Sequence, residues 1–124
     1  MSDQAVGRAP IGVGIDLADP ADFAAAAPAF LKRVFTDEER RRCDARRDRA
    51  VAYAEIWAAK EAAVKAVGGV WHLPQVNIDG GRATAISRQG ETPVDPDSDV
   101  AVSWARAGDS VMAVALAWPR KRIA

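Results

Sequence analysis

The sequence has little of what disulfide-stapled, transition-metal or membrane-spanning proteins require. Among 124 residues there is one cysteine, Cys43, and one histidine, His72. A single cysteine excludes an intramolecular disulfide, and His72 without cysteine or histidine partners gives no ligand set for zinc. No apolar run approaches the roughly 20 residues that span a bilayer. These absences favour a cytoplasmic protein with no membrane segment.

An excess of charge of one sign is also missing. The 17 basic and 17 acidic side chains cancel, so the net charge gives no reason to expect nucleic-acid binding. The length suits one domain with one hydrophobic core. Residues 1–10 lack the basic start and apolar stretch of a signal peptide. We therefore expect a flexible tail at 1–10 and one domain over 11–124.

The first third of the chain predicts one strand followed by short helices. Residues Ile11–Asp16 alternate β-branched side chains with glycine, which is typical of a strand packed closely against another element. The alanine-rich stretch after Pro20 favours helix, and Pro28 divides it into two short helices. Thr36 followed three residues later by Glu39 is a capping-box pattern, so a third helix should begin there.

The strongest helical periodicity runs from about Asp48 to Val67, where Gly68 and Gly69 provide a stop. Proline and acidic residues over Gln89–Asp99 predict a surface loop. Short β-prone runs predict four strands in two hairpins, at Gln75–Ile78, Arg82–Ser87, Val100–Trp104 and Val111–Trp118. Helices first and antiparallel strands afterwards, with one strand at the start, predict an α+β domain.

Four side chains could carry chemistry. Glu61 lies four residues before Lys65 on the predicted main helix, and Trp57 another four before, so the three share one face. Asp16 ends the first strand. Two carboxylates and a lysine are what Mg²⁺ and a phosphorylated substrate require. The simpler alternatives stay open: an exposed ion pair on a helix, and an aspartate that caps a turn.

Three segments, taken in order, form a pattern. Residues Gly12–Leu17 are a predicted strand that contains Gly-Ile-Asp. Residues Phe30–Thr36 are followed by two glutamates and Cys43, and residues Trp57–Ala66 read aromatic-x-x-Lys-Glu-Ala-x-x-Lys. In this order the segments resemble the opening strand, the second segment and the motif helix of the short 4′-phosphopantetheinyl transferases of the holo-acyl-carrier-protein synthase type, and the helix matches at each defining position. Together the segments cover most of residues 11–67.

The resemblance implies a single 4′-phosphopantetheinyl transferase-like domain, with antiparallel strands packed on a long helix. It implies transfer of the phosphopantetheine arm of coenzyme A to a serine of an apo acyl, polyketide or peptidyl carrier protein. Asp16 and Glu61 would bind Mg²⁺, and Glu61 and Lys65 would act in catalysis. A homotrimer is implied, with coenzyme A between subunits. The contacts expected with coenzyme A come from Lys60, Lys65, Ser103 and Arg106.

Two segments depart from the family pattern. Asp22 stands where the family usually has an arginine that contacts an acidic carrier protein, so the charge is reversed. Lys32, Arg33 and the run Arg40–Arg42 could replace it, or that run is a solvated helix face. Near the end, Val102–Ala107 keeps only the first two residues of the family's last motif, and Arg106 could replace its histidine at a phosphate.

These departures keep two alternatives open. The first is a degenerate member of the family that has a binding or scaffolding role, or catalyses a different reaction. The second is an unrelated α+β domain, which predicts that Asp16 and Glu61 lie far apart. A shared position for the two carboxylates would therefore separate the last alternative from the other two.

Overall fold

The computed structural model describes residues 12–86 and 98–119. The predicted tail at 1–10 and most of the loop predicted over Gln89–Asp99 lie outside these ranges. The elements are β1 (Gly12–Ala18), η1 (Pro20–Phe23), α1 (Pro28–Val34), α2 (Asp37–Asp44), α3 (Arg49–Ala66), η2 (Leu73–Gln75), β2 (Val76–Asp79), β3 (Arg82–Ala85), β4 (Ser98–Ala107) and β5 (Ser110–Pro119). The predicted α+β class is confirmed.

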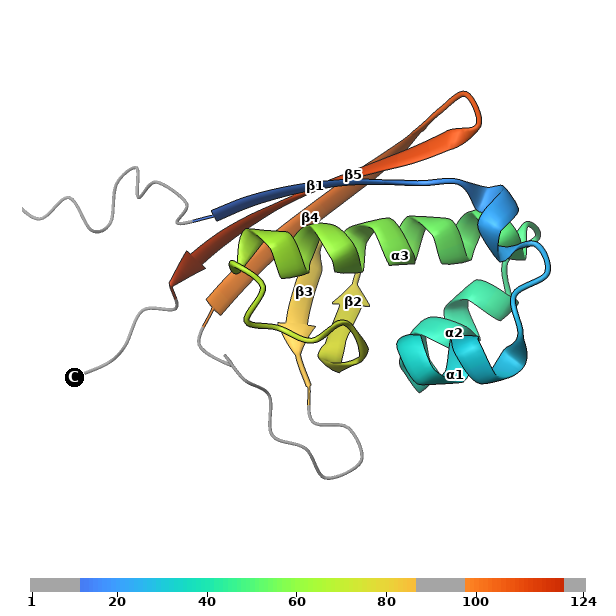
Figure 1. Ribbon diagram of the computed structural model, residues 1–124, viewed down its shortest axis with the longest axis horizontal. Coiled ribbons are helices and arrows are strands. Elements are labelled where there is room, and N and C mark those ends of the chain that lie inside the picture. The colour runs from blue at the N-terminus through green and yellow to red at the C-terminus, as the bar shows by residue number, and fades with distance from the viewer. Residues whose placement is uncertain (1–11, 87–97, 120–124) are drawn as a thin grey trace, which may run out of the picture.

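The β-strands form one antiparallel sheet in the order β1-β5-β4-β3-β2. The first strand is therefore an edge strand, and it pairs with the last one from Gly12 opposite Ala117 to Ala18 opposite Val111. Helix α3 lies along one face of the sheet, and α1 and α2 pack near its N-terminal end (Figure 1). Within the described residues, no helix is long and apolar enough to cross a membrane.

Among the strand boundaries that differ from the sequence prediction, two differ for the same reason. Strand β1 continues two residues past Asp16, and β4 begins at Ser98, inside the predicted loop. Both extensions are paired with β5, which is ten residues long and holds β1 on one side and β4 on the other. Long-range pairing therefore extends strands whose local sequence gives no such signal.

Helix α3 packs against β1 with backbone touching backbone. A Cβ atom added to Gly12 would lie 1.7 Å from the carbonyl oxygen of Ala66, and one added to Gly14 would lie 1.9 Å from that of Ala62. Only glycine fits at either position, because such distances are far below van der Waals contact. The two glycines thus set how close β1 lies to α3.

A buried ion pair joins α2, α3 and β2 on the other side of the helix. Lys60 and Glu39 have side chains with 0% exposure, and Lys60 Nζ donates to Glu39 Oε1 at 2.8 Å. The same oxygen accepts from the backbone N–H of Thr36, which completes the predicted capping box. Glu39 Oε2 accepts from the N–H of Ile78 at 2.7 Å. Each oxygen of this buried carboxylate therefore has a donor, as buried charge requires.

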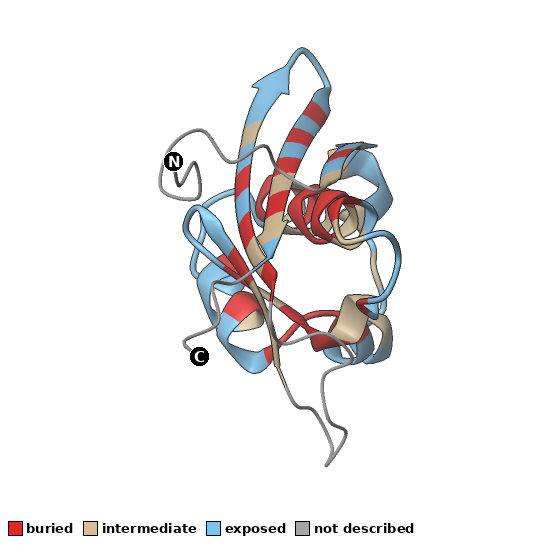
Figure 2. Ribbon diagram, turned by 90° about the vertical axis from the view of Figure 1, so that its left-hand side faces the viewer, coloured by how far each residue is buried: buried red, intermediate tan, exposed pale blue. Residues whose placement is uncertain are grey.

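The sheet face opposite α3 is apolar and open to solvent. Strands β4 and β5 alternate buried and exposed residues (Figure 2). Large apolar side chains gather on the exposed side: Val13, Ile15, Leu17, Met112 and Val114, with exposed fractions of 56, 56, 65, 50 and 39%. We call these five residues the outer sheet face.

Candidate functional site

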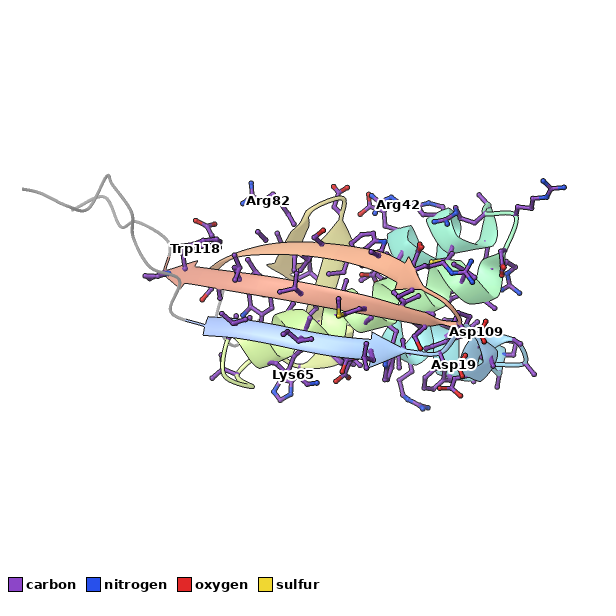
Figure 3. The ribbon with its side chains drawn as sticks, turned by 90° about the horizontal axis from the view of Figure 1, so that it is seen from above. Asp19, Arg42, Lys65, Arg82, Asp109 and Trp118 are labelled. Atoms are coloured by element: carbon purple, nitrogen blue, oxygen red, sulfur yellow. The ribbon has the colours of Figure 1, made fainter. Side chains whose placement is uncertain are left out.

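Strand β1 and helix α3 bring Asp16, Glu61 and Lys65 together at the edge of the sheet. Lys65 Nζ donates to Asp16 Oδ1 at 2.8 Å and to the backbone oxygen of Ile15 at 3.1 Å. Lys65 lies along the outer edge of β1 (Figure 3). The hydrogen-bond partner of Lys65 is thus Asp16, which lies 49 residues earlier in the chain. Glu61, one turn earlier on the same helix, is therefore not the only acidic neighbour of Lys65 among the described residues. We call these three residues the carboxylate–lysine site.

The electrostatics of Glu61 link it to the same site. Burial raises the pKa of the Glu61 carboxyl, the negative charge of Asp16 raises it further, and the Lys65 ammonium opposes both effects. The hydrogen bond from Lys65 to Asp16 in turn raises the pKa of Lys65. The negative charge of Asp16 on β1 therefore acts on Glu61 of α3, and the Lys65 ammonium acts on Glu61 in the opposite direction. This proximity is at odds with an unrelated domain in which Asp16 and Glu61 lie far apart.

The donor set of the site suits a hard cation better than a transition metal. Among the described residues, no group of three or more histidine, cysteine, aspartate or glutamate side chains is placed to hold a metal ion. His72 is exposed in the segment that follows α3. Two carboxylates are nevertheless enough for Mg²⁺, which commonly keeps several waters and takes further oxygens from substrate phosphates. The residues present therefore fit Mg²⁺ bound together with a phosphorylated substrate.

The structure corrects the expectation that Lys60 contacts coenzyme A. Its side chain has no exposed surface, and its ammonium group is bound to Glu39 and to the backbone oxygen of Val76. A ligand arriving from solvent cannot reach a buried ammonium that is held in this way. Lys60 belongs to the same sequence motif as Glu61 and Lys65, but it lies on the face of α3 that packs into the core.

Ser103 and Arg106 lie on β4, two strands from the carboxylate–lysine site. Asp16 is opposite Ala113 on β5, and Ala113 is opposite Trp104 on β4. Two strand spacings amount to roughly 10 Å. Ser103 is exposed on the side of the sheet turned away from α3, and Arg106 is exposed near the end of the β4–β5 hairpin. Within one chain, neither side chain adjoins Asp16.

The basic run on α2 is largely paired with acidic side chains. Arg40 pairs with Asp37, and Arg42 pairs with both Glu38 and Asp79. These contacts are on the protein surface and resemble a solvated helix face, one of the two interpretations of the run. Lys32, Arg33 and Arg41 line a groove of about 880 Å³ between α1, α2 and β2.

A smaller pocket of about 430 Å³ adjoins the carboxylate–lysine site. Its residues come from the end of β1, η1, α1, α3 and the start of β5: Leu17, Ala18, Asp19, Asp22, Phe23, Phe30, Trp57 and Ser110. We call it the aromatic pocket. Asp22 and Trp57 stood out in the sequence, but the pocket did not, because tertiary packing brings the two residues together. Phe23 and Phe30 were the residues in the sequence that could have indicated an aromatic pocket.

The chain is similar to known proteins over most of its length. Residues 12–114 match the 4′-phosphopantetheinyl transferase superfamily. The holo-[acyl-carrier-protein] synthase of Anaeromyxobacter dehalogenans (strain 2CP-1) is 44% identical over 90 residues, which cover 64% of this chain and 70% of that protein.

Solved structures give the same result. The ACPS–CoA complex of Chronobacterium ammoniagenes has a TM-score of 0.60 at 25% identity, covering 89% of this chain and 98% of that one. A holo-(acyl-carrier-protein) synthase from Bacillus anthracis has a TM-score of 0.68 at 19% identity, with coverage of 92% and 100%. The second likeness concerns the fold alone.

Proposed function

This chain belongs to the 4′-phosphopantetheinyl transferase superfamily, and from that premise we propose that it transfers the 4′-phosphopantetheine arm of coenzyme A to a carrier-protein serine. The observation that carries the proposal is the carboxylate–lysine site, where Asp16 and Glu61 adjoin one ammonium, that of Lys65. The relatives are named as holo-[acyl-carrier-protein] synthases, and one related structure is a complex with coenzyme A. The carrier would be an acyl, polyketide or peptidyl carrier protein, and the reaction would take place in the cytoplasm.

The proposed reaction is a displacement at phosphorus. The serine oxygen of the carrier forms a bond to the phosphorus that bears pantetheine, and the pyrophosphate P–O bond to the nucleotide breaks. Adenosine 3′,5′-bisphosphate leaves, and the serine proton passes to Glu61, directly or through a water. A carboxylate whose pKa is raised by burial is a better proton acceptor than an exposed one. Lys65 binds the phosphate oxygens, whose negative charge an ammonium stabilises.

We further propose that Asp16 and Glu61 hold Mg²⁺. When bound, the ion supplies charge neutralisation on the pyrophosphate. The support from this chain is the placement of Asp16 and Glu61 near the Lys65 ammonium, because Lys65 Nζ donates to Asp16 Oδ1 and the negative charge of Asp16 raises the pKa of Glu61. Titration calorimetry with Mg²⁺ in the presence of coenzyme A tests this directly. Binding should weaken by at least tenfold in Asp16→Asn, and unchanged binding would contradict the assignment.

The outer sheet face supports subunit association, and we propose the homotrimer that the family resemblance implies. Five large apolar side chains on β1 and β5 are exposed on one continuous surface, which is unusual for a monomer. Ser103 lies on the same side of the sheet, so burial of this face would place it at a subunit contact. Arg106 is opposite the buried Val111, so it lies on the α3 side of the sheet and the outer sheet face does not account for it. The predicted contact of Ser103 with coenzyme A therefore depends on this assembly.

Sedimentation analysis separates the possible assemblies. We expect a trimer for the unmodified protein and a monomer for Ile15→Glu, because a buried unpaired carboxylate is strongly unfavourable at an interface. Thr84→Glu, on β3 outside the outer sheet face, is the matched control and should remain trimeric. A trimer that persists in Ile15→Glu would show that subunits meet elsewhere.

The transferase activity itself is tested by intact-mass spectrometry. Apo carrier proteins are incubated with the protein, coenzyme A and Mg²⁺, and the gain of phosphopantetheine mass is measured. Glu61→Ala should abolish the gain, whereas Glu38→Ala, which removes an exposed glutamate on α2, should not. If no carrier is modified and coenzyme A does not bind, the alternative of a degenerate member with a binding role replaces the proposal. The reversed charge at Asp22 and the changed position Arg106 favour that alternative.

A further inference from the structure

The aromatic pocket combines an apolar floor with an acidic rim. The Trp57 ring lies 5.8 Å from the Phe23 ring and 6.0 Å from the Phe30 ring, centroid to centroid. Asp19 and Asp22 are exposed at its margin, and none of the eight lining residues is basic. The pocket can therefore hold an apolar side chain while its rim attracts positive charge.

No ion pair within residues 12–86 and 98–119 neutralises the negative charge of the rim. Asp19 Oδ1 accepts from the backbone N–H of Ala21, and in the described part of the chain neither Asp19 nor Asp22 forms an ion pair. The guanidinium of Arg33 lies 5.8 Å from the centroid of Phe30, one of the lining residues. Arg33 lines the separate groove between α1 and β2, together with Lys32 and Arg41. Asp37 and Glu38 also line that groove, but its basic residues outnumber them, whereas both charged residues of the aromatic pocket are acidic.

The aromatic pocket lies next to the carboxylate–lysine site, so a carrier protein bound at that site would cover it. Leu17 and Ala18 follow Asp16 directly on β1, and Trp57 precedes Glu61 by one turn of α3, about 6 Å along the axis. A protein that places a serine at the carboxylate–lysine site therefore extends over the pocket. Its surface there must complement two aspartates.

We propose that the aromatic pocket selects a carrier protein that presents an apolar side chain next to a lysine or arginine beside its acceptor serine. The inference rests on the proposed function and names its partner. The apolar group packs between Phe23, Phe30 and Trp57, and the basic group pairs with Asp22. An acidic residue at the same place is repelled, because its carboxylate would face two others.

The experiment uses one carrier scaffold in which single surface residues flanking the acceptor serine are changed to glutamate or lysine. kcat/KM for each carrier is measured at saturating coenzyme A. The unmodified protein should prefer lysine over glutamate by about tenfold at one or more flanking positions, and Asp22→Arg should invert that preference. The preference should shrink as the salt concentration rises.

The control variant is Asp79→Arg, which makes the same change in charge at the opposite edge of the sheet. Asp79 is exposed and pairs only loosely with Arg42, at 3.3 Å. This variant should keep the preference of the unmodified protein. An equal inversion in Asp79→Arg would mean that overall charge, rather than the pocket, sets the preference, and would overturn the inference.

A binding measurement separates this inference from the transferase proposal. Affinities of the same carriers for Glu61→Ala are measured without turnover. A lysine preference in binding, with no transfer by the unmodified protein, supports the docking surface and removes the transferase function. Transfer with equal rates to all carriers overturns the docking surface and leaves the function in place. If Asp22→Arg alters only the KM for coenzyme A, the pocket holds the pantetheine arm and the inference fails.

Discussion

Helix α3 carries two lysines, Lys60 and Lys65, that each pair with a carboxylate from another element. The two pairs differ in burial and in the number of their partners. Lys60 and Glu39 are wholly buried, and the carboxylate also binds two backbone N–H groups. Lys65 and Asp16 have side chains that are 50% and 15% exposed, and Glu61 adds a second carboxylate beside them. The buried pair is saturated with partners, whereas the exposed pair leaves charge available to a ligand. The comparison favours a structural role for the first pair, and it is the second pair that we propose takes part in the chemistry.

The largest expected effect comes from breaking the buried pair. Lys60→Met keeps much of the side-chain volume but leaves the Glu39 charge without its partner in the core. The free energy of unfolding should fall by about 3–5 kcal/mol, measured by chemical denaturation. Arg46→Met, which removes a cation from the exposed end of an ion pair with Glu55, is the control and should change little. An equal loss in both variants would contradict the distinction between buried and exposed pairs.

The next effect is on activity rather than stability. Glu61→Gln should lower kcat/KM for the carrier by about 100-fold or more, which corresponds to roughly 2.7 kcal/mol. The free energy of unfolding should stay within about 0.5 kcal/mol of the unmodified value, because Glu61 is only half buried and amide replaces carboxylate at equal volume. A variant that keeps its activity would remove Glu61 from the mechanism.

Gly14→Ala tests whether the contact between β1 and α3 positions the exposed pair. The new methyl group would lie 1.9 Å from the carbonyl oxygen of Ala62, so strand and helix must separate. We expect a loss of about 1–3 kcal/mol in unfolding free energy and a weaker Asp16–Lys65 contact. Gly81→Ala is the control, because its Cβ would lie 3.6 Å from the nearest atom, the backbone oxygen of Val102. Equal stability in the two variants would contradict the close packing.

A smaller effect on stability is expected from breaking the exposed pair. Lys65→Met should change the free energy of unfolding by less than about 1 kcal/mol, since exposed ion pairs contribute little. Carrier modification should nevertheless fall sharply, because the ammonium is the proposed phosphate ligand. A large loss of stability would make Lys65 a structural residue like Lys60.

The smallest effect is a pH dependence. The raised pKa of Glu61 means that the folded protein binds a proton more tightly than the unfolded chain does. This contribution to stability is present below the ordinary pKa of glutamate and is lost as the pH rises through the folded-state value. Subtracting the curve of Glu61→Gln from that of the unmodified protein isolates the effect. A difference that increases with pH in this window would have the wrong sign.

Local sequence predicted the parts of this structure that depend on neighbours along the chain. The capping box at Thr36 and Glu39 is formed as predicted, and Pro28 is the first residue of α1. The placement of Asp16 beside Lys65 followed from the order of motifs rather than from their spacing. The buried partner of Lys60 was not predicted, because Glu39 lies 21 positions earlier in the chain. Its role in the capping box gave no sign that it also forms an ion pair. Burial of a motif lysine is a tertiary property.

The pairing of the first strand with the last also bears on when the site forms. During synthesis Asp16 emerges roughly 100 residues before Ala113, the residue opposite it in the finished sheet, and closing so long a loop is slow. Until β5 is made, β1 has no neighbouring strand to hold its carboxylate toward α3. A chain released early, before β5, would carry Asp16, Glu61 and Lys65 and still lack a working site. Synthesis of β5 is therefore a condition for the site to form.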